Sequence, residues 1–291
     1  MRILNVSGRL VVETDNGGVD VAQASNGQYG TDVHGVFGQW EQFREWAATL
    51  APDQIDPDHR VPLEDAQLGA PSPTPRQVFA IGLNYRDHAA EAGFDLPADL
   101  PPTFTKFPTC ISAPHTGVHL PSGSVDWEVE LVAVIGRRAD KVSAELAWDH
   151  IAGLTVGQDF SERVVQMVGP VPQFSLGKSY PGFGPLGPRL VTPDEFADRD
   201  DLALECTING EQVQKGRTSQ MIFSVAELIA RLSAICPLLP GDVIFTGTPA
   251  GVGMARTPPR YLTPGDEVVS TIEGIGSLHN TCLPAVPPSV G

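Results

Sequence analysis

Basic residues are scarce in this sequence, and long hydrophobic runs are missing. Its 291 residues include 19 lysines and arginines against 35 aspartates and glutamates, a formal net charge of −16. A field of this sign repels phosphate backbones, so we expect no nucleic-acid partner. No apolar run approaches the ~20 residues that span a bilayer, and the start of the chain lacks the regions of a signal peptide. We therefore expect a soluble cytoplasmic protein without a membrane partner.

Closely spaced cysteines are also missing. The four cysteines are Cys110, Cys206, Cys236 and Cys282, with no C-x-x-C pair among them. This spacing argues against zinc ribbons and dithiol redox motifs. Because free cysteines are usually buried, we expect four buried thiols in a reducing compartment.

Glycine and proline are abundant, with 30 and 27 residues. This content is typical of short strands joined by turns rather than of a helical bundle. The segment Pro71–Pro75 predicts a boundary between a small N-terminal α+β module, residues 1–72, and a main domain, residues 73–291. The Pro-rich tail, residues 284–291, is expected to fray.

The pattern of apolar residues predicts an α+β fold that is mostly β. Apolar runs at 10–14 and 19–22 predict a hairpin, and the spacing of apolar residues from Trp40 to Leu50 predicts a helix. Ser224 and Glu227 form a capping-box pattern ahead of an apolar helix face that extends to Ile235. Strands are predicted at residues 78–81, 129–135, 202–208, 243–245 and 267–272. Because strands and helices do not alternate regularly, we expect no doubly wound sheet.

One glycine motif does not predict a nucleotide site. Residues 182–187 match G-x-G-x-x-G, which binds dinucleotides when a helix begins inside the motif. Pro185 and Pro188 stand where that helix would run, so we interpret the segment as a rigid loop. The Gly-rich segment 247–253 lacks the Lys-Ser/Thr of a phosphate-binding loop.

Two glutamates separated by one residue, Glu128 and Glu130, give the strongest local signal. On a strand they project from one face, about 6.6 Å apart along it. If the strand is buried, one carboxyl must keep its proton or a cation must lie between the two. Oxygen ligands favour Mg²⁺, Mn²⁺ or Ca²⁺. An edge strand with a solvated acidic face is the alternative, and these residues alone leave both open.

A third carboxylate, Asp159, follows the predicted strand at residues 151–158. Ligands often lie where a semi-buried strand ends, so Asp159 favours a metal site. An N-cap for a short helix beginning near Ser161 explains Asp159 equally well.

The segment Asn84–Gly93 predicts a short helix with Asn84 as its N-cap. His88 and Glu91 are three residues apart and therefore neighbours on one face. A carboxylate beside an imidazole orients the ring and raises its basicity, as in a general base that activates water. A solvated His–Glu pair has the same spacing. Lys178, in otherwise uncharged surroundings, is either a surface residue or an anion-binding group.

Taken in order, six segments of the main domain resemble the fumarylacetoacetate hydrolase family. The resemblance covers about residues 76–282. The segments are Ile81–Glu91, Asp126–Leu131, Gly157–Gln166, Lys178–Pro188, Asp242–Gly253 and Glu273–Leu278. Trp127 stands where the family commonly has Tyr, and Gln158 where it commonly has Asn. The resemblance implies a mixed β-sandwich or β-roll catalytic domain that is usually a homodimer.

The resemblance also implies roles for individual residues. It implies an Mg²⁺-type ion, with Mn²⁺ or Ca²⁺ as alternatives, held by Glu128, Glu130 and Asp159. His88 and Glu91 are then the water-activating dyad, on a helix that often belongs to a lid, and Lys178 is a catalytic residue facing the ion and the substrate. The positions that match the lining of the pocket are Tyr85, Arg163, Gln166 and Thr248.

Such a site implies a small anionic substrate with a 2-oxo-carboxylate or 1,3-diketone end, as in aromatic or sugar acid catabolism. We expect hydrolysis of a C–C bond: His88 takes a proton from water, hydroxide attacks a carbonyl, and the ion and Lys178 stabilise the leaving enolate. Decarboxylation of an acid such as oxaloacetate, and isomerase or lyase chemistry, are alternatives on the same scaffold. A non-catalytic ligand-binding protein is the rival from another class, and the complete set of site residues argues against it.

The net charge of the chain opposes the approach of such an anion. A divalent ion with Lys178 and Arg163 reverses the local charge, so this interpretation requires the metal. The other acidic residues crowd into stretches such as Asp53–Asp65 and Asp194–Asp201, where we expect them to be solvated. Residues 94–107 and 166–176 are expected to shape the substrate pocket.

Overall fold

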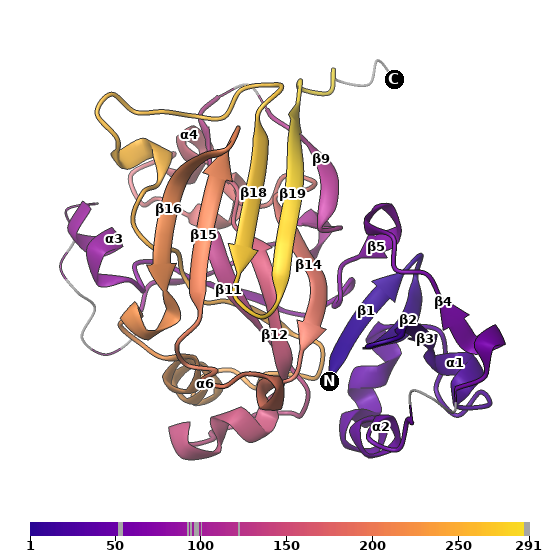
Figure 1. Cartoon of the computed structure of the whole chain (residues 1–291). Coiled ribbons are helices and arrows are strands. Elements are labelled where there is room, and N and C mark those ends of the chain that lie inside the picture. Colours follow the sequence, from indigo (N-terminus) through magenta and orange to yellow (C-terminus); the bar gives the residue numbers. More distant parts are fainter. Residues whose placement is uncertain are drawn as a thin grey trace.

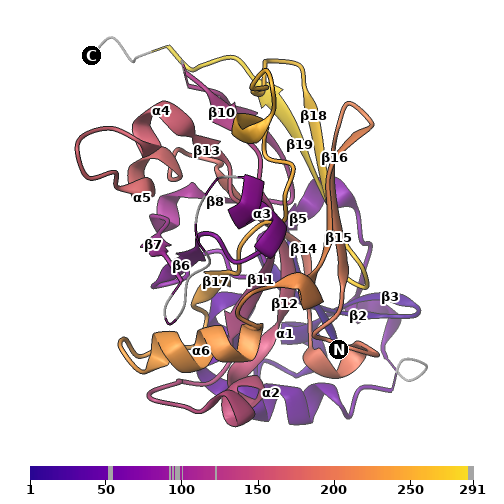
Figure 2. The same ribbon diagram turned by 90° about the vertical axis from the view of Figure 1, so that its left-hand side faces the viewer.

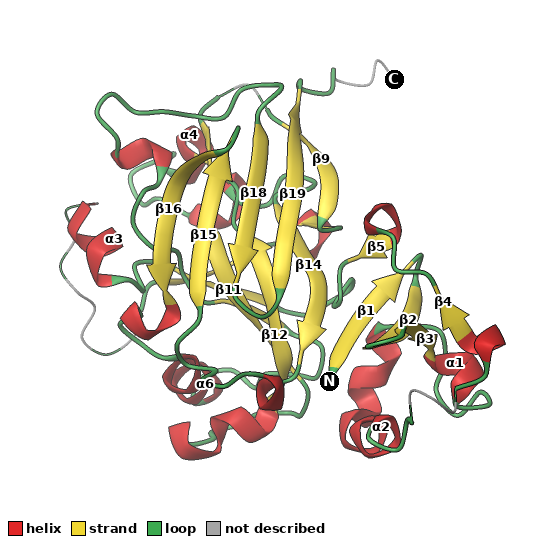
Figure 3. Cartoon of the chain, viewed as in Figure 1, coloured by secondary structure: helices red, strands yellow, loops and turns green. Residues whose placement is uncertain are grey.

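A computed structural model of the chain describes residues 1–51, 55–91, 93, 95, 99, 101–121 and 123–287. Two β-sheets pack against each other, and the N-terminal elements continue one of them on the right-hand side of Figure 1. Strand is the most frequent regular structure, and the helices are short and lie around the sheets (Figures 2 and 3). The predicted class, α+β and mostly β, is confirmed.

The larger sheet holds twelve strands. They are β1 (Arg2–Val6), β2 (Arg9–Thr14), β3 (Gly17–Asp20), β4 (Arg60–Val61), β5 (Leu68–Gly69), β6 (Val78–Ile81), β7 (Thr103–Thr105), β8 (Ile111–Ser112), β11 (Val129–Ile135), β12 (Ile151–Gln158), β14 (Gly184–Val191) and β17 (Val243–Phe245). Their order is β4-β3-β2-β1-β14-β12-β11-β17-β6-β7, with β5 on β1 and β8 on β14. The pairs β17–β6 and β14–β8 are parallel and the others antiparallel, so the sheet is mixed and not doubly wound.

The smaller sheet has five strands and faces the viewer in Figure 1. It comprises β9 (His115–His119), β15 (Ala203–Ile208), β16 (Glu211–Arg217), β18 (Glu267–Ile272) and β19 (Gly276–Leu283), in the order β16-β15-β18-β19-β9. A separate two-stranded ladder joins β10 (Val125–Asp126) to β13 (Ser161–Glu162). This ladder brings together the segment just before Glu128 and the segment just after Asp159.

The α-helices are short. They are α1 (Val21–Ala24), α2 (Trp40–Ala47), α3 (Arg86–Glu91), α4 (Arg163–Gln166), α5 (Phe174–Gly177) and α6 (Val225–Ser233). The 3₁₀ turns are His34–Gln39, Pro57–His59, Asp65–Gln67, Pro108–Cys110, Ala144–His150, Pro193–Glu195, Thr218–Gln220 and Gly253–Ala255. Helix α6 has the predicted capping box between Ser224 and Glu227. Ile235 lies beyond the end of α6 and is 71% exposed, so its assignment to the apolar helix face was wrong.

The N-terminal elements form the predicted hairpin and helix. Strands β2 and β3 pair antiparallel, although the second predicted run ends early because Val21 and Ala22 belong to α1. Strand β1 pairs with β14, with Ile3 opposite Leu190, so these residues continue the sheet of the main domain. The division of the chain at residue 72 stays a prediction.

Strand β11 lies at the centre of the fold. It pairs with β12 on one side and β17 on the other, and all seven of its residues are buried. Leu131 and Ala133 face the apolar core between the two sheets, whereas Val132 and Val134 join a second core with Trp40 of α2. The alternative of a solvated edge strand for Glu128 and Glu130 was therefore wrong.

Two further expectations concern thiols and glycines. Cys110, Cys206 and Cys282 are free and buried, as predicted, whereas Cys236 is only half-buried. The G-x-G-x-x-G segment contains no helix, as its prolines predicted, but residues 184–187 belong to strand β14, so the interpretation of the segment as a rigid loop was wrong there. Among the described residues, no helix is both long and apolar enough to cross a bilayer.

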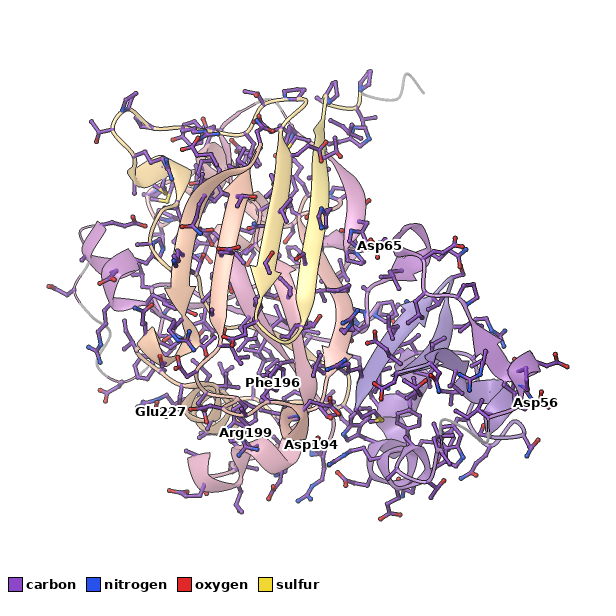
Figure 4. The ribbon with its side chains drawn as sticks, in the orientation of Figure 1. Asp56, Asp65, Asp194, Phe196, Arg199 and Glu227 are labelled. Atoms are coloured by element: carbon purple, nitrogen blue, oxygen red, sulfur yellow. The ribbon has the colours of Figure 1, made fainter. Side chains whose placement is uncertain are left out.

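The acidic stretches named in the sequence lie at the surface. Asp56, Asp65 and Asp194, labelled in Figure 4, are exposed. Asp53 and the end of the tail, residues 288–291, lie outside the described residues. Most of the negative charge is therefore solvated and separate from the buried carboxylates described next.

Candidate metal and catalytic site

Three carboxylates meet where β11 begins and β12 ends. The register pairs Val129 with Gln158, so Glu128 and Asp159 lie side by side, and the Asp159 amide donates to the Glu128 carbonyl at 2.9 Å. One carboxylate oxygen from each of Glu128, Glu130 and Asp159 lies within 4.8 Å of the others. The exposed fractions of these residues are 6%, 1% and 1%. The strand geometry thus brings together all three carboxylates predicted from the sequence.

Burial and charge act differently on the two glutamates. Burial disfavours the charged form of Glu128, but Lys178 and Arg163 outweigh it and lower the pKa of its carboxyl to about 2. For Glu130, burial and the charges of Asp159 and Glu128 raise the pKa of the carboxyl well above its ordinary value. The protein's own cations therefore compensate Glu128 and leave Glu130 in need of a proton or a cation.

Lys178 follows α5 and is fully enclosed by the cluster. Its ammonium donates to Glu128 Oε2, Asp159 Oδ2 and Ser161 Oγ, each at 2.7 Å. These three contacts use all three of its hydrogens. The surface alternative for Lys178 was wrong, because it is only 2% exposed. Its predicted contact with a substrate stays a prediction and requires one of these hydrogens to change partner.

A second lysine, Lys106, was missed from the sequence. It follows β7, is fully buried, and its ammonium lies 2.6 Å from Asp159 Oδ1. It also donates to the main-chain carbonyl of Lys178. The signal that singled out Lys178 was present here too, since Lys106 is the only charged residue in the stretch 101–113. Asp159 therefore binds these two lysines and does not cap a helix; Glu162 caps α4 instead.

Asp126, also missed, holds the Arg163 guanidinium beside Glu128. Asp126 Oδ2 accepts from Arg163 Nε at 2.9 Å and from Nη2 at 2.8 Å, and Arg163 Nη2 lies 2.7 Å from Glu128 Oε1. Arg163 Nη1 donates to Gln166 Oε1 at 2.9 Å. Asp126 also accepts from the Gly253 amide at 2.6 Å, which ties this pair to the segment 247–253. Arg163 and Gln166 are thus brought to the site, and their contact with a substrate stays a prediction.

The Thr248 hydroxyl joins the segment 247–253 to β11. It donates to the Val129 carbonyl at 2.9 Å and accepts from Gln214 Nε2 at 2.8 Å. Gln158 donates to Ser270 Oγ of the smaller sheet and accepts from the Glu128 amide. These bonds fix the backbone beneath the carboxylates, and the substrate-binding role of Thr248 stays a prediction.

The predicted His–Glu pair forms on α3. His88 Nδ1 lies 2.8 Å from Glu91 Oε1, and the side chains are 12% and 23% exposed. Both Glu91 oxygens accept from the Gly251 amide, at 3.0 and 3.1 Å. The same segment binds Glu130 through the Gly247 amide at 2.8 Å, so it connects the His–Glu pair to the carboxylates. The pair is therefore partly buried, and the segment 247–253 connects it to the cluster.

Asn84 does not have its predicted role as the N-cap of α3. Its amide nitrogen donates to the carbonyls of Thr246 and Phe223, and its oxygen accepts from the Phe223 amide. Helix α3 begins at Arg86. Asn84 fixes the entry to α3 against two other loops, and helix propensity alone does not reveal such a tertiary role.

The donor set suits a hard divalent ion. Oxygen ligands about 2.0–2.6 Å from one ion lie a few ångströms from one another, as these three do. The buried charged groups that the carboxylate cluster and its ion pairs connect are four acids, Asp126, Glu128, Glu130 and Asp159, and three bases, Lys106, Arg163 and Lys178. If all are ionised, a formal excess of one negative charge remains. Glu128, Glu130 and Asp159 can therefore hold a metal ion, which would give the site a net positive charge.

Three clustered buried carboxylates and a His–Glu pair on a mostly β fold are the arrangement that the resemblance to the fumarylacetoacetate hydrolase family implied. The sequence profile described as fumarylacetoacetate (FAA) hydrolase C-terminal matches residues 77–283. The chain belongs to this family, as its six segments predicted.

Several relatives of known name resemble this chain. The human oxaloacetate tautomerase FAHD2A, mitochondrial, is 45% identical over 222 residues, covering 76% of this chain and 70% of that protein. A crystal structure of a putative HpcE protein from Mycobacterium smegmatis is 52% identical with a TM-score of 0.92, covering 98% of this chain and 100% of that one. The crystal structure of maleylpyruvate hydrolase from Sphingobium sp. SYK-6, in complex with manganese(II) and pyruvate, is 27% identical with a TM-score of 0.79. The match covers 98% of this chain and 100% of that one.

Proposed function

We propose that this chain is a metal-dependent enzyme that moves a proton between carbon and oxygen of a small 2-oxo acid, as in the tautomerisation of oxaloacetate. The observation that carries the proposal is the His88–Glu91 pair, 2.8 Å apart, beside the Glu128–Glu130–Asp159 cluster. The 45% identity to the human oxaloacetate tautomerase supports this substrate class. We propose Mg²⁺ or Mn²⁺ as the ion, and a homodimer in the cytoplasm as the working form.

A bound divalent ion supplies polarisation of the ketone oxygen of the substrate. The chain's own residues supply the proton transfer. With Nδ1–H donated to Glu91, the imidazole of His88 presents Nε2 as a base. Nε2 takes a proton from the carbon that lies between the ketone and the second carboxylate of oxaloacetate. The same nitrogen then returns this proton to the ketone oxygen, which yields the enol. No water is consumed and no bond between carbon atoms breaks.

Local charge explains how an acidic protein holds an anionic acid. Lys106, Arg163 and Lys178 lie within a buried cluster whose formal charge becomes positive with a divalent ion. A buried site of low dielectric strengthens its attraction for a carboxylate well beyond that of an exposed site. The net charge of the whole chain, −16, opposes only the approach of the anion from solution.

The test is the rate of enol–ketone interconversion of oxaloacetate, followed by the ultraviolet absorbance of the enol with and without Mg²⁺. His88→Asn removes the base and keeps the polar shape, so we expect a fall in kcat of about 10²–10⁴-fold. His119→Asn, on β9, is the matched control and is expected to keep full activity. Equal rates for His88→Asn and the unaltered protein would refute the proposal.

Hydrolysis of an acylpyruvate, the reaction predicted from the sequence, is the second candidate. The full-length similarity to maleylpyruvate hydrolase favours it, and the same His88–Glu91 pair can take a proton from water instead of carbon. Acetylpyruvate distinguishes the two reactions, because only hydrolysis releases acetate and pyruvate. Release of pyruvate in an Mg²⁺-dependent manner, lost in His88→Asn, would make hydrolysis the main activity.

A further inference from the structure

The short helix α3, which carries the His–Glu pair, is held at both ends. At its start, Tyr85 is buried and forms a β-bridge with Met221, and its predicted contact with a substrate stays a prediction. At its end, both carboxylate oxygens of Glu91 accept from the Gly251 amide, at 3.0 and 3.1 Å. Glu91 Oε1 also lies 2.8 Å from His88 Nδ1. The position of Gly251 therefore determines where the carboxylate lies that orients the imidazole.

Gly251 is itself held by Trp127, the residue directly before Glu128. The indole Nε1 of Trp127 donates to the Gly251 carbonyl at 3.2 Å, within the range of a hydrogen bond. Gly251 has a φ of +109°, and a Cβ added there would clash with the Val213 carbonyl of β16. Such a backbone conformation favours glycine, so this close approach fixes the residue further. The two polar backbone groups of Gly251 thus connect Trp127 on one side to Glu91 on the other.

The indole of Trp127 is locked in place. The side chain is fully buried. The Cζ atoms of Arg256 and Arg260 lie 5.6 and 5.8 Å from the centroid of its ring, within the range of a cation–π interaction. A Cβ added at Gly253 would lie 2.9 Å from Trp127 Cη2, so the main chain packs against the edge of the ring. These contacts fix the direction in which the indole N–H points.

We propose that Trp127 is a positioning residue for the proton transfer. Its indole holds Gly251, and Gly251 holds the Glu91 carboxylate that orients His88. The inference rests on the proposed function, because it acts on the base of that reaction. The competing explanation is that Trp127 merely fills the core and supports its neighbour Glu128. Loss of support for Glu128 weakens ion binding, whereas loss of the link through Gly251 affects only the His–Glu pair.

The experiment measures kcat and KM on the full chain for tautomerisation of oxaloacetate and hydrolysis of acetylpyruvate, and Mn²⁺ affinity by titration calorimetry. Trp127→Phe removes the N–H donor together with part of the ring. Trp127→benzothienylalanine replaces the N–H by sulfur and keeps the shape, so it separates the hydrogen bond from the packing. Trp40→Phe is the matched control, because Trp40 is also buried, at 3% exposure, and its Nε1 has no hydrogen-bond partner in the described part of the chain.

Both Trp127 variants should lower kcat about tenfold, because the hydrogen bond that fixes Gly251 is lost. KM and Mn²⁺ affinity should stay within twofold of the unaltered values, because the single donor of the indole bonds to Gly251 and to no carboxylate. Trp40→Phe should change none of the three. A kcat within twofold of the unaltered value in both Trp127 variants would overturn the proposal, and so would a larger loss of Mn²⁺ affinity. If Trp127→Phe does not fold, the benzothienylalanine variant decides alone.

A double-mutant cycle with Glu91→Ala tests the route of the effect. Glu91→Ala removes the carboxylate through which Trp127 acts, so Trp127→Phe should lower kcat less than twofold further in that background. A tenfold fall there as well would overturn the proposal. If the unaltered protein catalyses neither reaction, the proposed function and this inference fail together. If His88→Asn loses activity and both Trp127 variants keep it, only the role of Trp127 fails.

Discussion

Lys106 and Asp159 form a fully buried ion pair, with 2.6 Å between Nζ and Oδ1. The other oxygen of Asp159 accepts from Lys178 at 2.7 Å, so two lysines from distant parts of the chain hold one carboxylate from both sides. Lys106 also donates to the main-chain carbonyl of Lys178. The orientation of Asp159 is thereby fixed before any ion binds, which makes Lys106 a positioning residue.

Replacing Lys106 by Met should destabilise the metal-free protein and increase its response to Mn²⁺. The substitution leaves a buried carboxylate with one cation fewer, at a cost of about 3–5 kcal/mol. A divalent ion restores that charge, so Mn²⁺ should raise the melting temperature more in Lys106→Met than in the unaltered protein. Lys215→Met, at an exposed position without an ion pair among the described residues, is the control and should change neither quantity.

An equal response to Mn²⁺ in Lys106→Met and the unaltered protein would contradict this coupling. A second variant, Lys106→Gln, can hydrogen-bond to Asp159 without carrying a charge. It should show the same increased response with a smaller loss of stability, because the charge difference is the same and one hydrogen bond is kept.

The two glutamates of the cluster should respond differently to the same substitution. Glu128 is ionised and paired with Lys178 and Arg163, so Glu128→Gln leaves two buried cations short of a partner and should cost about 3 kcal/mol or more. The raised pKa of Glu130 favours its neutral form without a cation, and glutamine keeps an oxygen for the Gly247 amide. Glu130→Gln should therefore change the unfolding free energy by less than about 1 kcal/mol.

Denaturant unfolding without metal measures this difference, and Mn²⁺ titration completes the comparison. Both variants should lose Mn²⁺ affinity by at least tenfold, because each loses a charged oxygen ligand. Retained Mn²⁺ affinity in Glu130→Gln would exclude Glu130 from the ligand set. Equal losses of stability in the two variants would contradict the assigned charge states.

The sequence predicted the carboxylates because spacing and strand periodicity place them. Glu128 directly precedes β11, Glu130 is its second residue, and Asp159 directly follows β12. The local pattern therefore marked all three as candidates, and the family resemblance decided for a metal site. The short helix with His88 and Glu91 was likewise readable from its spacing. These features depend on residues a few positions apart, or on two adjacent strands.

The missed residues depend on contacts between distant segments. Lys106 reaches Asp159 across 53 positions, and Asp126 receives the Gly253 amide across 127. Asn84 was misassigned as a helix cap because its partners, Thr246 and Phe223, come from loops far along the chain. A single sequence carries no periodic signal for such pairs, although an isolated lysine in an uncharged stretch marked both Lys106 and Lys178.

Gly177 should tolerate no side chain, because α5 crosses α4 closely just before Lys178. A Cβ at Gly177 would lie 2.5 Å from the Gln166 amide nitrogen and 2.8 Å from the Glu162 carbonyl. Gly177→Ala should therefore push α5 outward, cost about 1–3 kcal/mol and displace Lys178 from Glu128 and Asp159. We expect kcat to fall by more than the smaller folded fraction of the variant accounts for. Gly38→Ala, where a Cβ meets nothing within 4 Å, is the control.

The thiols should divide into one reactive and three protected groups in the native protein. Burial raises the pKa of Cys206 to about 12, and the same cause raises that of Cys282 to about 12, so neither forms the reactive thiolate at pH 8. Cys110 is fully buried and burial raises its pKa as well, whereas Cys236 is half-buried. A disulfide reagent should therefore label one thiol rapidly, and Cys236→Ser should abolish that phase. Labelling in denaturant should count all four thiols, and rapid labelling of two or more in the native protein would contradict the packing of β15 and β19 described here.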